Sequence, residues 1–154
     1  QQIKRYENCI PLYDVSAAAG PFKGIEEDYA IDWIELPSLK KYSDEYFVIR
    51  VMGESMNKKI PNNSYCLFKK DTGGSRNGKI VLVQHQDIQD HKYGIGLTVK
   101  EYHSTKKITE ELWQHDSITL KPKSTDSTFK DIVVNIESAE EFKILGIFEK
   151  VLGE

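Results

Sequence analysis

Two residues of this chain, Ser55 and Lys100, have the types and settings that nucleophilic serine chemistry requires. Ser55 stands in the segment Gly53-Glu54-Ser55-Met56, directly after an apolar run, and the glycine permits a sharp turn there. A serine hydroxyl attacks a carbonyl only when a base takes its proton and backbone N–H groups face the developing oxyanion. The N–H groups of Glu54 and Ser55 are the candidates for that oxyanion hole. An ordinary turn at a strand end is the alternative interpretation.

Lys100 is the candidate base because of the apolar segment that carries it. In the alternation of a strand, Leu97 and Val99 point to one face while Thr98, Lys100 and Tyr102 point to the other. Burial disfavours the ammonium and lowers the pKa of the lysine, so a neutral amine becomes available as a base. A solvent-facing lysine on an alternating strand is the alternative.

A third feature is the small-residue bond Ala19-Gly20, which lies upstream in a segment of small residues, 16–21 (SAAAGP). Small side chains on both sides of a peptide bond let an extended segment lie deep in a cleft, close to a nucleophile. On composition alone, the same residues also fit a flexible hinge.

The remaining chemistry-bearing side chains predict no further site. The four histidines lack metal-ligand spacing and are expected in solvated loops; they are His85, His91, His103 and His115. Three carboxylates are expected as surface charge, namely Asp87, Asp90 and Glu101. We expect neither a metal nor a cofactor.

Composition favours one globular unit. The chain has 154 residues, 39% hydrophobic and 29% charged, with a formal net charge of −3. That balance argues against nucleic-acid binding by its own surface field. No apolar run approaches the ~20 residues of a membrane span. Since no helix-turn-helix is visible, DNA binding would need a domain absent from this chain or a partner. The start at Gln1 without Met fits a piece of a longer protein.

The chain divides into an arm, residues 1–44, and a body, residues 45–154. The arm holds Pro11, Pro21 and Pro37, three of the five prolines, and only short apolar groups, so we expect it to lie outside the core. The body reads as short strands separated by turn signals, with one weak indication of helix at residues 109–114. The expected strands are 46–52, 65–68, 79–84, 96–102, 118–121, 132–136 and 142–148. This pattern predicts a mainly β fold, with twisted antiparallel sheets in a partly open sandwich or barrel.

Taken together and in order, these segments resemble the LexA and UmuD family of self-cleaving serine peptidases, the S24 type. Residues 46–56 (YFVIRVMGESM) resemble its strand and nucleophile turn, and residues 97–102 (LTVKEY) resemble the strand that bears the base. Residues 76–83 and 142–148 resemble two further strands, the last of which helps to form the family's dimer. The resemblance implies Ser55 as nucleophile, Lys100 as neutral general base and Ala19-Gly20 as the scissile bond.

The same resemblance implies a biological setting. The domain would be a LexA-like C-terminal peptidase domain, cytoplasmic and homodimeric, that cleaves itself as a DNA-damage or stress-linked switch. A RecA-type filament on single-stranded DNA would be the trigger. The alternative is a non-catalytic LexA-like dimerisation or sensor module of a larger DNA-associated protein. A membrane-acting signal-peptidase relative would share the Ser/Lys chemistry, but nothing here anchors a membrane.

Two departures from the family pattern stand out. Asn62-Asn63-Ser64 replaces the common Asp-Gly-Asp after the nucleophile turn, and residues 103–116 are longer and more polar than expected. Ser55 and Lys100 are also somewhat farther apart than usual, with the excess in residues 85–93. None of these removes a catalytic group. They leave open whether the chain is a repressor proper or a peptidase module attached to a different protein.

Overall fold

The computed structural model describes residues 2–37, 39, 41, 43–71, 73–108, 114–136 and 142–153. Nine strands and two short 3₁₀ helices follow one another along these residues: β1 Ile10–Tyr13, η1 Ala17–Ala19, η2 Glu27–Tyr29, β2 Asp32–Ile34, β3 Tyr46–Val51, β4 Ser64–Lys70, β5 Ile80–Gln84, β6 Leu97–Ile108, β7 Gln114–Lys121, β8 Ile132–Ile136 and β9 Lys143–Val151. Within the described residues, no helix has the length and apolar character needed to cross a membrane.

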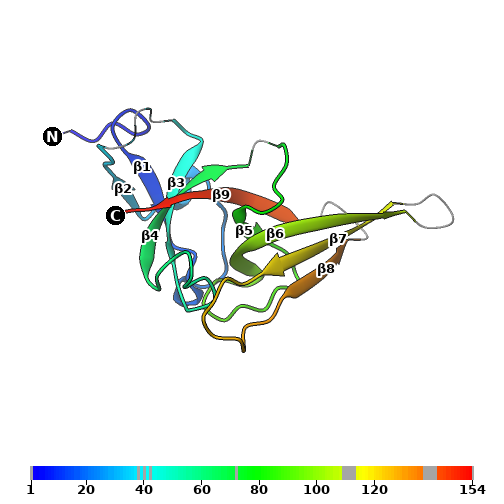
Figure 1. Ribbon diagram of the computed structural model, residues 1–154. Helices are drawn as coiled ribbons and strands as arrows, with labels where there is room; N and C mark the ends of the chain where they lie inside the picture. The colour runs from blue at the N-terminus through cyan, green and yellow to red at the C-terminus, as the bar shows by residue number, and fades with distance from the viewer. Residues whose placement is uncertain are drawn as a thin grey trace.

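The strands form one sheet in the order β2-β1-β3-β4-β9-β5-β6-β7-β8. β1 and β3 run parallel, and the other neighbouring pairs run antiparallel. The sheet is twisted and stays open, with β2 and β8 at its two ends (Figure 1). The prediction of a mainly β, partly open fold is therefore confirmed, although the sheet is mixed rather than antiparallel throughout.

The seven strands expected in the body all form, because each is a local run of β-branched and aromatic residues. β8 has the expected bounds, and β6 is longer than expected, so that β6 and β7 make a hairpin that projects from the rest of the sheet (Figure 1). The weak indication of helix at residues 109–114 falls mostly on 109–113, which lie outside the described residues. Gln114 is the first residue of β7.

The expectation that the arm lies outside the core is wrong for its first strand. All four residues of β1, Ile10–Tyr13, are buried. β1 pairs in parallel with β3, where Leu12 faces Val48, and antiparallel with β2. A parallel pairing joins segments that are distant in sequence, so its partner leaves no signal next to β1 in the chain.

The last strand, β9, occupies the middle of the sheet between β4 and β5 (Figure 1). Its Gly146 is buried where the Phe47 ring crosses the strand, and Phe47 in turn stacks on Phe68 at 5.8 Å between ring centroids. A Cβ at position 146 would lie 2.5 Å from Phe47 Cζ and 3.2 Å from the Lys69 carbonyl oxygen. This close approach requires a glycine.

We expect Gly146→Ala to lower the free energy of unfolding by about 1–3 kcal/mol, because the added methyl overpacks the contact with Phe47. Urea unfolding followed by fluorescence measures the change. Glu149→Ala, at an exposed position of the same strand, is the matched control and should stay within ~0.5 kcal/mol of wild type. Equal stability of the two variants would show that the contact relaxes freely.

Candidate active site

Ser55 lies in a tight turn just beyond the end of β3. Gly53 opens the turn with φ of +87°, a left-handed conformation that favours glycine. A Cβ there would also lie 3.1 Å from Lys92 Cγ. The serine side chain is buried, with 7% of its surface exposed. The predicted role of Gly53 in allowing this turn is therefore seen in its backbone.

Two other segments hold the serine turn through hydrogen bonds. The Gly53 N–H donates to Asn62 Oδ1 at 2.7 Å, so the asparagine that departs from the family pattern supports the turn. The Ser124 hydroxyl donates to the Glu54 carbonyl at 2.7 Å, and the Lys123 N–H donates to the Ser55 carbonyl at 2.9 Å. Within the described part of the chain, the N–H groups of Glu54 and Ser55 have no hydrogen-bond partner. The turn thus holds two donors that a substrate oxygen can use.

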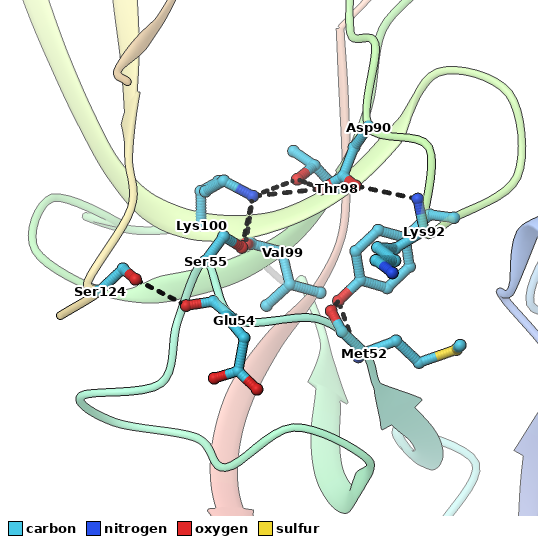
Figure 2. A network of polar contacts seen from close by, with 10 residues as sticks. Met52, Glu54, Ser55, Asp90, Lys92, Thr98, Val99, Lys100 and Ser124 are labelled. Carbon is cyan, nitrogen blue, oxygen red and sulfur yellow. Dashed lines mark hydrogen bonds and ion pairs between the residues drawn. The ribbon is translucent and has the colours of Figure 1, made fainter. Parts of the chain in front are cut away.

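Lys100 reaches the serine from β6. Its side chain is 4% exposed, and Nζ lies 3.0 Å from Ser55 Oγ (Figure 2). Thr98, two residues earlier on the same face of the strand, accepts a hydrogen bond from Nζ at 2.7 Å. The Val99 carbonyl lies at 3.2 Å. The structure therefore brings together the two residues that the sequence singled out, and places both out of solvent.

Burial lowers the pKa of the Lys100 amine below its ordinary value of 10.5. The Asp90 carboxylate opposes this shift, because its Oδ2 lies 3.2 Å from Nζ. Burial favours the neutral amine and the carboxylate favours the ammonium. The protonation of Lys100 at neutral pH is set by the balance of these two effects.

Asp90 is a site residue that the sequence reasoning missed. It was expected as surface charge, yet its side chain is only 16% exposed and it accepts hydrogen bonds from both Lys100 and Thr98, the latter at 2.8 Å. Glu101 was also expected at the surface, but it is 15% exposed and pairs with Lys123. Asp87, at 69% exposed, is the one of the three that matches the expectation. The loop before β6 carried no sequence signal for Asp90, since its contact with Lys100 depends on how the loop folds back.

The loop before β6 is hydrogen-bonded to Met52, which lies directly after β3 and before the serine turn. The Tyr93 hydroxyl donates to the Met52 carbonyl and accepts from the Met52 N–H, both at 3.2 Å. Burial raises the pKa of Tyr93 above its usual range, so this hydroxyl keeps its proton. The loop that carries Asp90 is thereby held in register with the serine turn.

Residues 15–17 of the arm pair with residues 92–94 of this same loop. Ser16 and Tyr93 form an antiparallel bridge, with the Ala17 N–H donating to the Lys92 carbonyl and the Gly94 N–H donating to the Val15 carbonyl, each at 3.0 Å. The chain leading to Ala19 therefore runs beside the segment that touches Lys100.

The Ala19-Gly20 bond itself is not at the dyad. Ala17–Ala19 form η1, closed by bonds from the Ala19 N–H to the Ser16 carbonyl and from the Gly20 N–H to the Ala17 carbonyl, each 3.1 Å. Ala19 lines a cavity of about 350 Å³ with Tyr13 and Phe22. Ser55 and Lys100 line a different cleft. The structure thus brings together two of the three predicted features, Ser55 and Lys100, and leaves the Ala19-Gly20 bond outside their cleft.

The cleft over Ser55 and Lys100 has a volume of about 380 Å³ and is open to solvent. Its lining includes the apolar side chains of Phe129 and Ile132 and the loop residues 89–92.

The expectation that the histidines lie in solvated loops is wrong for three of the four, because His103 lies in β6, His115 lies in β7 and His85 is buried. His85 is 3% exposed; its Nδ1 accepts the Asp87 N–H at 3.1 Å, and its ring packs near Phe142. Among the described residues, no group of three or more His, Cys, Asp or Glu side chains is arranged to hold a metal ion.

Comparison with known proteins gives one family. The model of the Peptidase S24-like family matches residues 11–148, from β1 to the middle of β9. No curated protein sequence matches the chain.

Proposed function

The chain belongs to the Peptidase S24-like family, and from this premise we propose that it is a serine peptidase that cleaves its own Ala19-Gly20 bond. In the proposal Ser55 is the nucleophile and Lys100 the general base. Members of this family are generally peptidases. The roles of Ser55 and Lys100, the choice of bond and the self-cleavage go beyond the family membership and are what we propose.

The observation that carries the proposal is the buried contact between Ser55 Oγ and Lys100 Nζ at 3.0 Å. A general base must lie within about 2.6–3.2 Å of the proton that it takes. Burying an amine costs free energy unless it is paired and hydrogen-bonded, and the contacts of Nζ with Asp90 and Thr98 compensate this cost while Nζ stays in contact with Ser55. Among the described residues, Lys100 is the base whose side chain makes a hydrogen bond with Ser55 Oγ.

The chemistry follows from these positions. Neutral Lys100 takes the proton from Ser55 Oγ as this oxygen attacks the Ala19 carbonyl carbon, and the oxyanion is stabilised by the N–H groups of Glu54 and Ser55. Lys100 then gives its proton to the Gly20 nitrogen as the peptide bond breaks. The acyl group stays on Ser55 until a water, deprotonated by Lys100, releases it. The products are residues 1–19 and residues 20–154.

The pairing of arm and loop supports cleavage within one chain. The bridge pairs Ser16 with Tyr93, and antiparallel strands continue by stepping one residue on each side. If η1 unwinds and the ladder continues, Ala18 comes opposite His91 and Ala19 opposite Asp90. Asp90 contacts Lys100, so this register brings the bond to the dyad with only a few residues moving. Arm movement of this kind would govern the rate as much as the chemistry does.

We expect self-cleavage to accelerate with rising pH, because only the neutral amine can act as a base. The fraction of neutral Lys100 grows about tenfold per pH unit below its pKa, and burial places that pKa below 10.5. The rate should therefore climb from pH 7 and level off before about pH 10.5. Incubating the purified chain at about pH 7 and about pH 10 and measuring intact mass gives the products and their rate.

The same experiment separates the alternatives. A cut at another bond would refute the Ala19-Gly20 assignment but keep the peptidase. An intact chain at both pH values, with Ser55 unreactive toward a fluorophosphonate probe, would support the non-catalytic dimerisation or sensor module instead. A rate that falls as pH rises would exclude a lysine base.

The setting of the cleavage belongs to the same proposal. We propose a regulatory switch linked to DNA damage or stress, triggered by a RecA-type filament, in a cytoplasmic homodimer. In such a dimer β9 offers no free edge at Gly146 and Ile147, since β4 and β5 pair with it on both sides there. Contact between copies would use the outer strands or a face of the sheet.

A further inference from the structure

Asp90 makes two sets of contacts, one through each carboxylate oxygen, and a serine–lysine pair does not need either of them for its chemistry. One carboxylate oxygen, Oδ2, accepts from Lys100 Nζ at 3.2 Å and from the Thr98 hydroxyl at 2.8 Å. The other, Oδ1, accepts from the Lys92 N–H at 3.1 Å. The side chain thus joins the base of the dyad to the backbone of the loop on which the arm pairs.

The Lys92 N–H is the next donor of the ladder between arm and loop. The bridge already uses the Ala17 N–H and the Lys92 carbonyl. In an antiparallel pair the same two residues exchange both bonds, so the next bond would run from the Lys92 N–H to the Ala17 carbonyl. Both groups already have partners in this structure. The Lys92 N–H donates to Asp90 Oδ1, and the Ala17 carbonyl accepts from the Gly20 N–H.

We propose that Asp90 is a positioning residue that acts as a latch on the dyad: its carboxylate holds the Lys100 ammonium and caps the Lys92 N–H that the extended arm needs. The proposal rests on the self-cleavage described above and adds its regulation. Docking of the arm competes with Asp90 for the Lys92 N–H. When Asp90 loses that bond, its carboxylate is less firmly held against Lys100, and the buried amine gives up its proton more readily.

The electrostatic surroundings single out Asp90 for this role. The ionisable side chains around the cleft come from the serine turn, the loop before β6 and the segment before β8: Glu54, Asp90, His91, Lys92 and Lys130. Within the described residues, only Asp90 forms an ion pair with Lys100. An opposite charge at this distance typically shifts a pKa by 1–3 units. Without the Asp90 charge, nothing named here opposes the lowering of the Lys100 pKa by burial.

The test uses Asp90→Asn, which removes the charge and keeps the shape, in the full chain. With Ser55→Ala in the background, so that no cutting occurs, ¹³C NMR of the lysine Cε follows the titration of Lys100. We expect its midpoint to fall by about one unit or more. Asp87→Asn, an exposed carboxylate of the same loop, should leave it unchanged. Asp90→Ala serves if the asparagine variant does not fold.

With Ser55 intact, the proposal predicts that the cleavage rates of Asp90→Asn and wild type, plotted against pH, cross. At about pH 7 Asp90→Asn should cleave several-fold and up to about tenfold faster than wild type, since more of its lysine is neutral. At alkaline pH it should be no faster in the chemical step, because both amines are neutral and the wild-type lysine is the stronger base. A purely structural role for Asp90 would slow cleavage at every pH.

The outcomes separate the two proposals. An unchanged Lys100 midpoint in Asp90→Asn overturns the latch, whether or not the chain cleaves. Uniformly slower cleavage in that variant overturns it too. If neither wild type nor variant cleaves at any pH, the proposed peptidase fails, while the titration still decides whether Asp90 holds the charge on Lys100.

Discussion

Replacing Lys100 with alanine is expected to abolish self-cleavage at every pH, with a fall in rate of about 10³-fold or more. General-base catalysis alone contributes about 10²–10⁴-fold. Lys100 Nζ is also the only amine in contact with Ser55 Oγ among the described residues. Ser55→Ala removes the nucleophile and should have an effect at least as large. Intact-mass kinetics between about pH 7 and about pH 10 measures both variants.

The matched control is Lys130→Ala, which removes a lysine that lines the same cleft but donates to the Ser127 carbonyl rather than to the dyad. It should cleave within a few-fold of wild type. Thermal unfolding monitors the fold of each variant, because Lys100→Ala leaves the carboxylate of Asp90 without its cation. Continued cutting by folded Lys100→Ala or Ser55→Ala would sink the dyad assignment.

A second large effect is expected from Ala17→Pro, which removes the N–H that ties the arm to the Lys92 carbonyl. The resting backbone accepts proline here. Ser16 is extended, with φ of −72° and ψ of 155°, as a residue before proline prefers, and position 17 is the first of η1. The fold and the resting turn should persist while the docked ladder is weakened. The bond from the Ala17 N–H is lost from the resting bridge as well, so the difference comes from the proline φ of about −65°, which suits η1 but not an extended strand. A cost of about 1.4 kcal/mol to the docked arm alone slows cleavage about tenfold.

Ala17→Ser keeps the N–H and is the control at the same position; its rate should stay near that of wild type. Mass spectrometry of the released residues 1–19 gives both rates. If Ala17→Pro cleaved as fast as wild type, the arm would reach the dyad by some route other than the ladder with Tyr93. Mixing Ser55→Ala chains with intact ones would then test for cutting between chains.

The sequence predicted the strands of the body because their signals are local. β3 and β5 are runs of branched and aromatic residues bounded by turns, and such runs form strands wherever they find a partner. β1 and β2 were not predicted because they are short and lie among prolines. In addition, β1 pairs with β3, which lies far along the chain. Their burial against the sheet is a property of the tertiary fold.

For the candidate site the limit was similar. Ser55 and Lys100 were visible because a glycine turn and an alternating strand mark their positions in the chain. Asp90 was invisible because a polar loop residue carries no pattern, and its contact with Lys100 depends on the clamp between Tyr93 and Met52. Thr98 was assigned to the right face, but its hydrogen bond to the amine became visible only in three dimensions.

The central place of β9 also sets an order of events on the ribosome. Ser55 follows β3 and Lys100 lies in β6, and in the sheet the two halves are joined through β9, which lies between β4 and β5. Synthesis proceeds from the N-terminus at ~5–20 residues per second, so the arm, the serine and the lysine all emerge before residues 143–151 do. Until β9 inserts, β4 and β5 lack their common neighbour. The self-cleavage that we propose therefore becomes possible only after β9 has been synthesised and has joined the two halves of the sheet.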